Sequence, residues 1–279
     1  MQIALLVNRK SGGGKGLTVL DEVIPFLLQH NINHQSFIDS WPIDFGLFDC
    51  IWIIGGDGTL NYFINKYLDI KIPIAIIKGG TGNDFAWKLY GEVSLNYQLN
   101  QLIKGNIIKV DVGICNGKYF LNGIGVGFDG EILKSMDKIR WLGGHLGYLL
   151  VVIKKIFNFK EQTFEIKFNN NKIISKFLLM SVFNSSRTGG GFHITPTADI
   201  SDGLLNVLLC SPLNVFKRLF YLPKIEKGKH LHLPFIHHNL SKNILIKCTQ
   251  PTFAQIDGEL FCDKSFSVSI LEKKLSFIV

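Results

Sequence analysis

The segment C-I-W-I-I-G-G-D-G-T-L-N-Y-F, from Cys50 to Phe63, decides the fold because it joins an apolar strand to a helix through a glycine-rich turn. Residues 50–54 are all apolar, which is typical of a strand buried on both faces of a sheet. The turn G-G-D-G follows, and the sequence predicts a helix over residues 59–68. This order of elements indicates a βαβ unit with parallel strands.

The same alternation of strand and helix continues on both sides of this segment. It predicts further strands at residues 2–7, 33–38, 72–77 and 107–112, and helices at residues 17–30, 83–89 and 95–104. Strands that alternate with helices pair in parallel, and such sheets bind ligands beyond the carboxyl ends of their strands. The first part of the chain is therefore predicted to be a Rossmann-like α/β domain.

After Lys118 most segments alternate apolar and polar residues with a period of two, which is typical of antiparallel strands. Residues 163–168 and 172–183 predict a hairpin, and further strands are predicted at residues 204–210, 230–235, 244–249, 252–256 and 266–271. Residues 130–159 have helical spacing instead. We predict two domains: an α/β domain of residues 1–119 with 265–279, and a mainly antiparallel β domain of residues 120–264.

Composition excludes several classes of protein. With 47% hydrophobic and 19% charged residues, the chain of 279 residues buries a core rather than staying disordered. No apolar run approaches the roughly 20 residues of a membrane span, and the first residues lack the features of a signal peptide, so we expect a cytosolic protein. The formal charge of +8 suits an anionic partner, which nucleotide, nucleic acid and an anionic membrane face would all provide.

Three glycine-rich loops follow predicted strands, at residues 11–16, 55–59 and 79–84. Glycine lets backbone amides approach a ligand closely, and each loop opens a helix whose N-terminus favours an anion. The three loops together predict a phosphate-binding edge, although glycines that only form tight turns remain an alternative. Neither GxxxxGK[ST] nor a GxGxxG motif with its distant acidic residue is present.

Several blocks occur in an order that resembles the diacylglycerol and sphingosine lipid kinases, in their bacterial branch. They are N-R-K-S-G-G-G-K-G (8–16), I-I-G-G-D-G-T-L-N-Y-F (53–63), G-G-T-G-N-D-F-A (79–86), V-D-V-G (110–113), F-L-N-G-I-G-V-G-F-D-G (120–130), G-G-G-F-H-I-T-P-T-A-D-I-S-D-G-L-L-N-V (189–207), K-I-E-K-G-K-H (224–230) and Q-I-D-G-E (255–259). The resemblance implies a nucleotide-binding domain related to NAD kinase and phosphofructokinase, followed by a β-sandwich lipid-binding domain.

The resemblance also implies an activity and a nucleotide site. The implied enzyme uses ATP and Mg²⁺ to transfer the γ-phosphoryl group to a hydroxyl of a lipid such as diacylglycerol. Its implied nucleotide contacts are Asn8, Ser11, Gly12, Ser40, Gly55, Gly56, Asp57, Gly58, Thr59, Gly80, Thr81, Gly82, Asn83 and Asp84.

Acidic residues carry the implied catalysis. By resemblance, Glu259 is the general base, and Asp57, Asp84 and Asp111 form a network that positions the catalytic Mg²⁺. A second, structural Mg²⁺ is implied at Asp199, Asp202 and Leu204. The alternatives are that Asp84 caps a helix, that Asp111 is a buried structural residue, that Glu259 is a solvated charge and that Asp202 only forms a turn.

The segment between Ser40 and Asp57 departs from the family because it is short, and we predict that a helix is missing or rebuilt there. Two other functions remain open: phosphorylation of a soluble ribose, as in NAD kinases, and non-catalytic binding of nucleotide or lipid. Residues 142–159 with Trp141 either touch a membrane or form a core helix. We expect no nucleic-acid partner. The implied lipid substrate lies at the membrane surface, so we expect a cytoplasmic protein that associates transiently with the membrane, whereas a homodimer and the identity of the lipid stay open.

Overall fold

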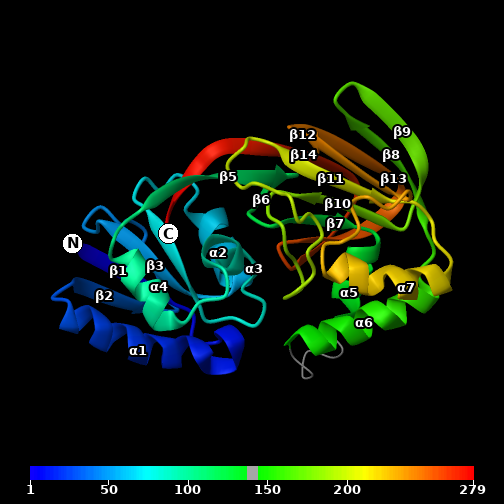
Figure 1. The fold of residues 1–279 in the computed structure, drawn as a ribbon. Helices are drawn as coiled ribbons and strands as arrows, with labels where there is room; N and C mark the ends of the chain where they lie inside the picture. Colours follow the sequence, from blue (N-terminus) through cyan, green and yellow to red (C-terminus); the bar gives the residue numbers. More distant parts are fainter. Residues whose placement is uncertain (137–143) are drawn as a thin grey trace. The chain divides into compact units, whose positions relative to one another are not determined.

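The computed structural model describes residues 1–136 and 144–279. The chain forms two compact units, unit 1 (Met1–Val110 with Lys273–Val279) and unit 2 (Asp111–Glu272). Strands β5 (Ile107–Cys115) and β14 (Glu259–Ile278) each contain one of the two boundaries, so the chain passes between the units within strands (Figure 1).

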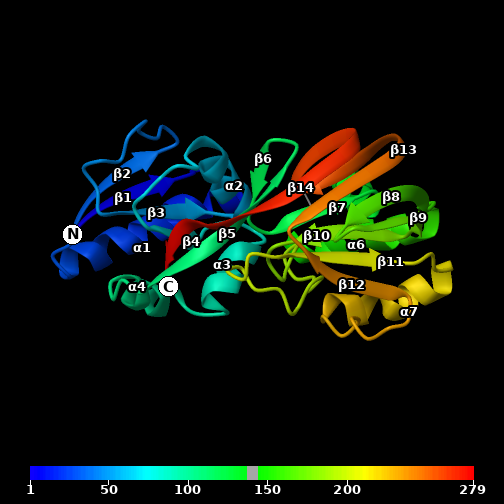
Figure 2. The ribbon, with the colours of Figure 1, turned by 90° about the horizontal axis from the view of Figure 1, so that it is seen from above.

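Unit 1 is built on a parallel sheet, as the sequence predicts. Its strands are β1 (Gln2–Val7), β2 (Asn33–Ile38), β3 (Cys50–Gly55), β4 (Ile74–Lys78) and the end of β14, in the order β14-β4-β3-β1-β2 (Figure 2). All the pairings within this order are parallel. Every residue of β3 is buried, because helices and loops cover both faces of the sheet.

Four α-helices and one 3₁₀ helix accompany this sheet. They are η1 (Ser11–Gly14), α1 (Lys15–Gln29), α2 (Asp57–Lys66), α3 (Asp84–Tyr90) and α4 (Leu95–Leu102). Leu27 of α1 and Leu99 of α4 share a buried cluster with alternate residues of the strands, including Leu5 and Trp52. Phe63 of α2 and Phe85 of α3 are fully buried outside that cluster.

The connection from β2 to β3 has no helix, in agreement with the short sequence there. It packs through aromatic rings instead, since the Phe45 ring lies 6.3 Å from that of Phe63 and 5.3 Å from that of Tyr67. Tyr67 also donates its hydroxyl hydrogen to the Pro42 carbonyl at 2.8 Å. These contacts replace the cover that a crossover helix usually gives a parallel sheet.

Unit 2 is an antiparallel sandwich with helices on one side. Its strands are β6 (Lys118–Phe120), β7 (Gly123–Val126), β8 (Gln162–Phe168), β9 (Asn171–Phe177), β10 (Leu179–Phe183), β11 (Leu205–Cys210), β12 (Ile236–Ser241), β13 (Asn243–Ile256) and β14. The strands are hydrogen-bonded in the order β12-β11-β10-β7-β13-β14, β8 pairs with β13 and β9, and the end of β5 pairs with β6. The register of β13 shifts between Lys247 and Thr252, where its partner changes from β8 to β7.

Helices α5 (Phe128–Met136), α6 (Gly144–Asn158) and α7 (Val215–Glu226) cover the face of β10 and β11 that points away from the sandwich core. Met180 and Val182 of β10 join the core between the layers, whereas Leu179 and Phe183 join the helices. The predicted strand at residues 230–235 is wrong, because α7 precedes these residues and leaves them in turns before β12. None of the helices in the described part of the chain is long and apolar enough to cross a bilayer.

Candidate active site

Three glycine-rich loops touch one another where β1, β3 and β4 end. A Cβ built on Gly80 would lie 2.4 Å from Gly56 Cα, and one built on Gly12 would lie 2.5 Å from the Gly79 carbonyl oxygen. Larger residues would push these loops apart, so the close approach itself requires glycine. The loop backbones are thereby gathered at the edge where parallel sheets bind ligands.

Asn8 and Thr59 join the first two loops. Asn8 follows β1, and its Nδ2 donates a hydrogen bond to Thr59 Oγ1 at 3.0 Å. Gly12, Gly13 and Gly14 all have positive φ, so this loop is a left-handed turn that glycine adopts without strain and that leaves no side chain over its amides. The arrangement suits phosphate oxygens, because backbone amides and a hydroxyl are gathered at one edge.

Asp57 holds the N-terminus of α3. Its Oδ2 accepts a hydrogen bond from the Asp84 amide at 3.0 Å, and its Oδ1 accepts one from the Phe85 amide at 2.9 Å. The carboxylate therefore lies at the positive end of α3 and fixes the third glycine loop relative to the second. Asp84, only 5% exposed, lies next to it in the first turn of α3.

Asn83 closes the third loop on itself. Its Oδ1 accepts from the Gly80 amide at 2.9 Å, and its Nδ2 donates to the Gly80 carbonyl at 2.8 Å. The side chain that sequence reasoning assigns to phosphate is thus engaged in shaping the loop, and its own backbone is left-handed with φ of 51°. Thr81 is exposed at the tip of this loop, beside the half-buried Gly82.

Ser40 is exposed just after β2, where its amide donates to the Ile38 carbonyl at 2.7 Å. The turn before it is tied to the first loop, because Arg9 forms an ion pair with Asp39 and the Arg9 amide donates to Asp39 Oδ1. The arginine at position 9 therefore has a structural partner in this chain.

Asp111 belongs to unit 2 and is fully buried there. Its Oδ2 accepts from the Gly203 amide at 2.7 Å, and its own amide donates to the Ile200 carbonyl at 2.7 Å. Asp111 thus anchors the loop that carries Asp199 and Asp202. Burial raises the pKa of Asp202, and the carboxylates of Asp199 and Asp111 raise it further.

Asp257 fixes the turn that precedes Glu259. Its carboxylate accepts three backbone hydrogen bonds, from Leu121 at 2.7 Å and from Asn122 and Gly123 at 2.9 Å each. Asp257 has φ of 45°, so it forms the turn and also ties this turn to the chain before β7. Glu259 begins β14 with its side chain exposed on this rigid base.

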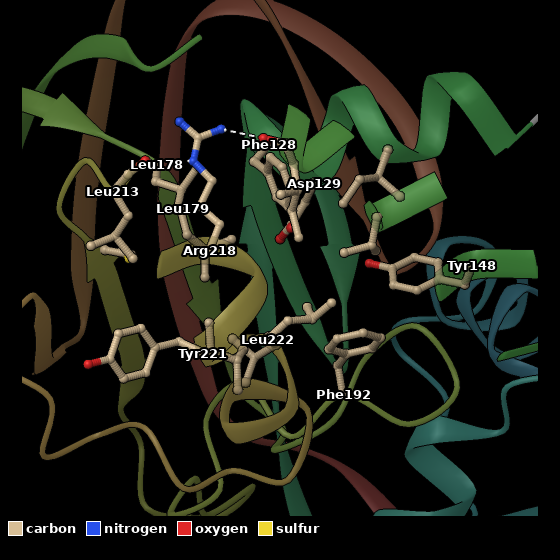
Figure 3. A pocket seen from close by; sticks show the side chains of 16 residues that line it. Phe128, Asp129, Tyr148, Leu178, Leu179, Phe192, Leu213, Arg218, Tyr221 and Leu222 are labelled. Atoms are coloured by element: carbon tan, nitrogen blue, oxygen red, sulfur yellow. Dashed lines mark hydrogen bonds between the residues drawn. The ribbon is translucent and has the colours of Figure 1, made fainter. Parts of the chain in front are cut away.

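An apolar pocket lies in unit 2 between the helices and the sheet, with a cavity volume of about 60 Å³. Phe128, Tyr148, Phe192 and Leu222 line it, and Figure 3 shows the rings of Tyr148 and Phe192 on one side and Arg218 on the other. Asp129 is the only carboxylate among the described residues that line this pocket. Burial raises its pKa to about 6.

Arg218 was not singled out from the sequence, because α7 itself was not predicted. Its Nε donates to the Leu213 carbonyl, its Nη1 donates to the carbonyls of Ile156 and Phe159, and its Nη2 pairs with Glu161. This guanidinium joins the C-terminal end of α6 to α7. The signal available in the sequence was Asn214, whose side chain caps α7 by accepting from the Lys217 amide at 2.9 Å.

A parallel sheet with three glycine-rich loops at one edge, followed by an antiparallel sandwich, is the two-domain architecture of the NAD kinase-like phosphotransferases. Residues 2–115 match the model of the diacylglycerol kinase catalytic domain. Residues 122–279 match that of the YegS C-terminal NAD kinase beta sandwich-like domain. The chain belongs to the diacylglycerol kinase and YegS family of lipid kinases, which are phosphotransferases with an alcohol acceptor.

Relatives of this chain carry the corresponding names. A diacylglycerol kinase of Mycobacterium tuberculosis (strain ATCC 25618 / H37Rv) is 26% identical over 238 residues, covering 82% of this chain and 76% of the relative. A diacylglycerol kinase of Bacillus subtilis (strain 168) is 24% identical over 216 residues, covering 76% of this chain and 71% of the relative. The crystal structure of a diacylglycerol kinase from Bacillus anthracis str. Sterne has the same fold, with a TM-score of 0.76 at 23% identity and coverage of 99% and 96% of the two chains.

The donors at the glycine loops fit a magnesium–nucleotide complex. Among the described residues no group of three side chains could hold a metal ion alone. Mg²⁺ is commonly bound through one or two carboxylates together with phosphate oxygens and water. Asp57 and Asp84 are acidic residues in direct contact, through the Asp84 amide and the Asp57 carboxylate. Asp57 and Asp84 therefore fit an ion that arrives with its nucleotide.

Proposed function

We propose that this lipid kinase transfers the γ-phosphoryl group of ATP to a hydroxyl of a lipid such as diacylglycerol. The observation that favours a lipid over a soluble acceptor is the apolar pocket of unit 2. Burying hydrocarbon against Phe128, Phe192 and Leu222 releases about 25 cal/mol for each Å² removed from water, whereas a soluble ribose would gain little there. An acyl chain would need more room than the observed cavity, so the helices have to adjust around it.

In this proposal the nucleotide phosphates bind the three glycine loops. The amides of residues 12–14 and of the loop after β3, together with the Thr59 hydroxyl, hold and orient the triphosphate. Mg²⁺, when bound with the nucleotide, neutralises charge on the phosphates. Asp57 and Asp84 would hold it, and the hydrogen bonds from α3 to Asp57 keep that carboxylate in place.

Glu259 is the proposed general base. As the lipid oxygen attacks the γ-phosphorus, the hydroxyl proton passes to the Glu259 carboxylate, the new P–O bond forms and ADP leaves with the electrons of the broken bond. The three amide hydrogen bonds to Asp257 hold the turn that presents Glu259. This step requires Glu259 and the γ-phosphate to meet during the reaction.

The loop of Asp199, Asp202 and Leu204 is the proposed structural cation site. A cation would offset the mutual repulsion that helps to raise the pKa of Asp202. Such an ion supports the fold of unit 2 and takes no part in the transfer.

The test is an assay with labelled ATP, offering diacylglycerol in mixed micelles and, separately, NAD. The proposal expects a labelled phospholipid and no labelled dinucleotide, and it expects Asp57→Ala to abolish the lipid product. Phosphorylation of NAD alone would favour a soluble acceptor. Binding of ATP without product across a panel of lipids would favour a non-catalytic protein.

A further inference from the structure

Helices α6 and α7 each have two distinct faces. On α6, Tyr148, Val152 and Ile156 recur at intervals of four residues and line the apolar pocket. On α7, Leu222 and Ile225 line the same pocket. Because both helices pack their inner faces on the same side of the sheet, their outer faces point away from it.

The outer faces carry large apolar side chains that are left in solvent. Leu150 and Phe157 of α6 are 54% and 57% exposed, and Phe216 and Phe220 of α7 are 84% and 67% exposed. The two α7 rings lie four residues apart and therefore on one face. Membrane contact, one of the two alternatives for residues 142–159, therefore concerns the outer face of α6, whereas the inner face of α6 is part of the core. Trp141 and Leu142 lie outside the described residues.

Lysines surround these apolar side chains. Lys154 lies between Leu150 and Phe157 on α6, and Lys217 and Lys224 are exposed on α7. The Lys224 Nζ lies 5.7 Å from the centre of the Phe220 ring. Along Gly144–Asn158 there is no acidic residue, and Val215–Glu226 has a single one at its end.

We propose that the outer faces of α6 and α7, defined by Leu150, Lys154, Phe157, Phe216, Lys217, Phe220 and Lys224, bind the surface of an anionic lipid bilayer. Aromatic and leucine side chains enter the boundary between headgroups and acyl chains, and lysines attract anionic headgroups. An acidic protein partner would match the lysines but would leave less reason for four exposed apolar side chains. The bilayer satisfies both sets at once.

The biological purpose of this surface rests on the proposed function, because a lipid kinase takes its substrate from a membrane. The helices that would touch the bilayer also line the apolar pocket with their inner faces, so a lipid leaving the bilayer would reach the pocket without crossing bulk water. Arg218 joins the two helices through their backbone carbonyls and Glu161. They would therefore meet the membrane together.

The test is sedimentation of the full chain with vesicles of phosphatidylglycerol and with vesicles of phosphatidylcholine. We expect binding to phosphatidylglycerol vesicles that weakens with salt, and little binding to phosphatidylcholine. The double variant Phe216→Ser/Phe220→Ser should bind roughly tenfold more weakly, and Lys217→Gln/Lys224→Gln should lose roughly fivefold for each lysine. The matched controls are Ile43→Ser/Leu47→Ser, whose side chains are 93% and 88% exposed in unit 1, and Lys104→Gln/Lys176→Gln.

Each outcome of these experiments supports or overturns the proposed membrane surface. Equal vesicle binding by the α7 variants and the wild type would overturn the proposal, as would equal loss in the controls. If the wild type sediments alone as a dimer and the phenylalanine variant as a monomer, a second copy covers this face and the proposal fails. An activity assay with a short-chain diacylglycerol in detergent micelles separates the kinase proposal from the membrane proposal. The α7 variants should retain the wild-type activity in this assay. A wild type without activity would refute the kinase function but would leave the vesicle-binding result unchanged.

Discussion

Replacing Asp129 with asparagine should stabilise the protein at neutral pH, because the carboxyl is buried at an apolar pocket. The side chain is 7% exposed, and Ser181 Oγ donates to it at a long 3.3 Å. Burial raises its pKa from 3.8 to about 6. The neutral form is favoured by folding, so stability is fully present below the unfolded pKa and is lost as pH rises through the folded pKa.

The difference in pKa corresponds to on the order of 3 kcal/mol once the carboxyl is fully ionised, near pH 8. Roughly half of this cost is already present at about pH 5, and it levels off above about pH 7. Asp129→Asn has nearly the same shape and does not titrate, so its stability advantage over the wild type should grow with pH across this window. Asp21→Asn, which removes an exposed carboxylate from α1, controls for net charge.

The assay is urea unfolding of the wild type and both variants from about pH 4 to about pH 8. A difference between wild type and Asp129→Asn that stays constant with pH would refute the reasoning. So would a difference that shrinks as the pH rises, because the carboxylate would then be stabilised by the fold.

Three further predictions concern structure and cation binding. Arg218→Met should cost about 3–5 kcal/mol in urea unfolding, since it leaves Glu161 and three carbonyls without their donor, while the neighbouring Lys217→Met should be nearly neutral. Gly80→Ala should destabilise the protein by about 1–3 kcal/mol and lower its thermal midpoint, because the new Cβ overpacks against the second loop. The control Gly58→Ala, which has nothing within 4 Å of its new Cβ, should not lower the midpoint. Equal effects of the two variants would contradict the close approach of Gly80 to Gly56. Mg²⁺ at tenfold its Kd should stabilise the wild type by about 1.4 kcal/mol in thermal melts and should leave Asp202→Ala unchanged; equal shifts would place the ion elsewhere.

Periodicity predicted the architecture well where one pattern dominated. The mostly apolar β1 and β3 and the alternating β8 appear as predicted, because burial on two faces or on one leaves different patterns. The hairpin of β8 and β9 is also present, but the single strand predicted at residues 172–183 is wrong, because the chain ends β9 at Phe177 and begins β10 at Leu179 between β7 and β11. Helix α7 was missed since its solvent face carries Phe216 and Phe220, which hides the amphipathic pattern. The strand predicted at residues 230–235 is wrong because these residues form turns between α7 and β12, where His230 is buried with its Nε2 beside the Ile194 carbonyl.

The candidate site was likewise predicted only in part from the sequence. Sequence placed three glycine loops at one sheet edge, and the structure brings their backbones together. It could not reveal that Asn83 would be used within its own loop, or that Asp57 would accept the amides of α3, because both depend on short contacts between distant or turned segments. The catalytic roles of all four acidic residues, Asp57, Asp84, Asp111 and Glu259, remain predictions that rest on resemblance.

The most direct measurement of the central claim is the turnover of Glu259→Gln with ATP and micellar diacylglycerol, together with its affinity for ATP. Loss of a general base predicts a fall in kcat of roughly a hundredfold or more with an unchanged Kd for ATP. Turnover close to that of the wild type would contradict the account, because proton removal from the lipid hydroxyl would then not depend on Glu259.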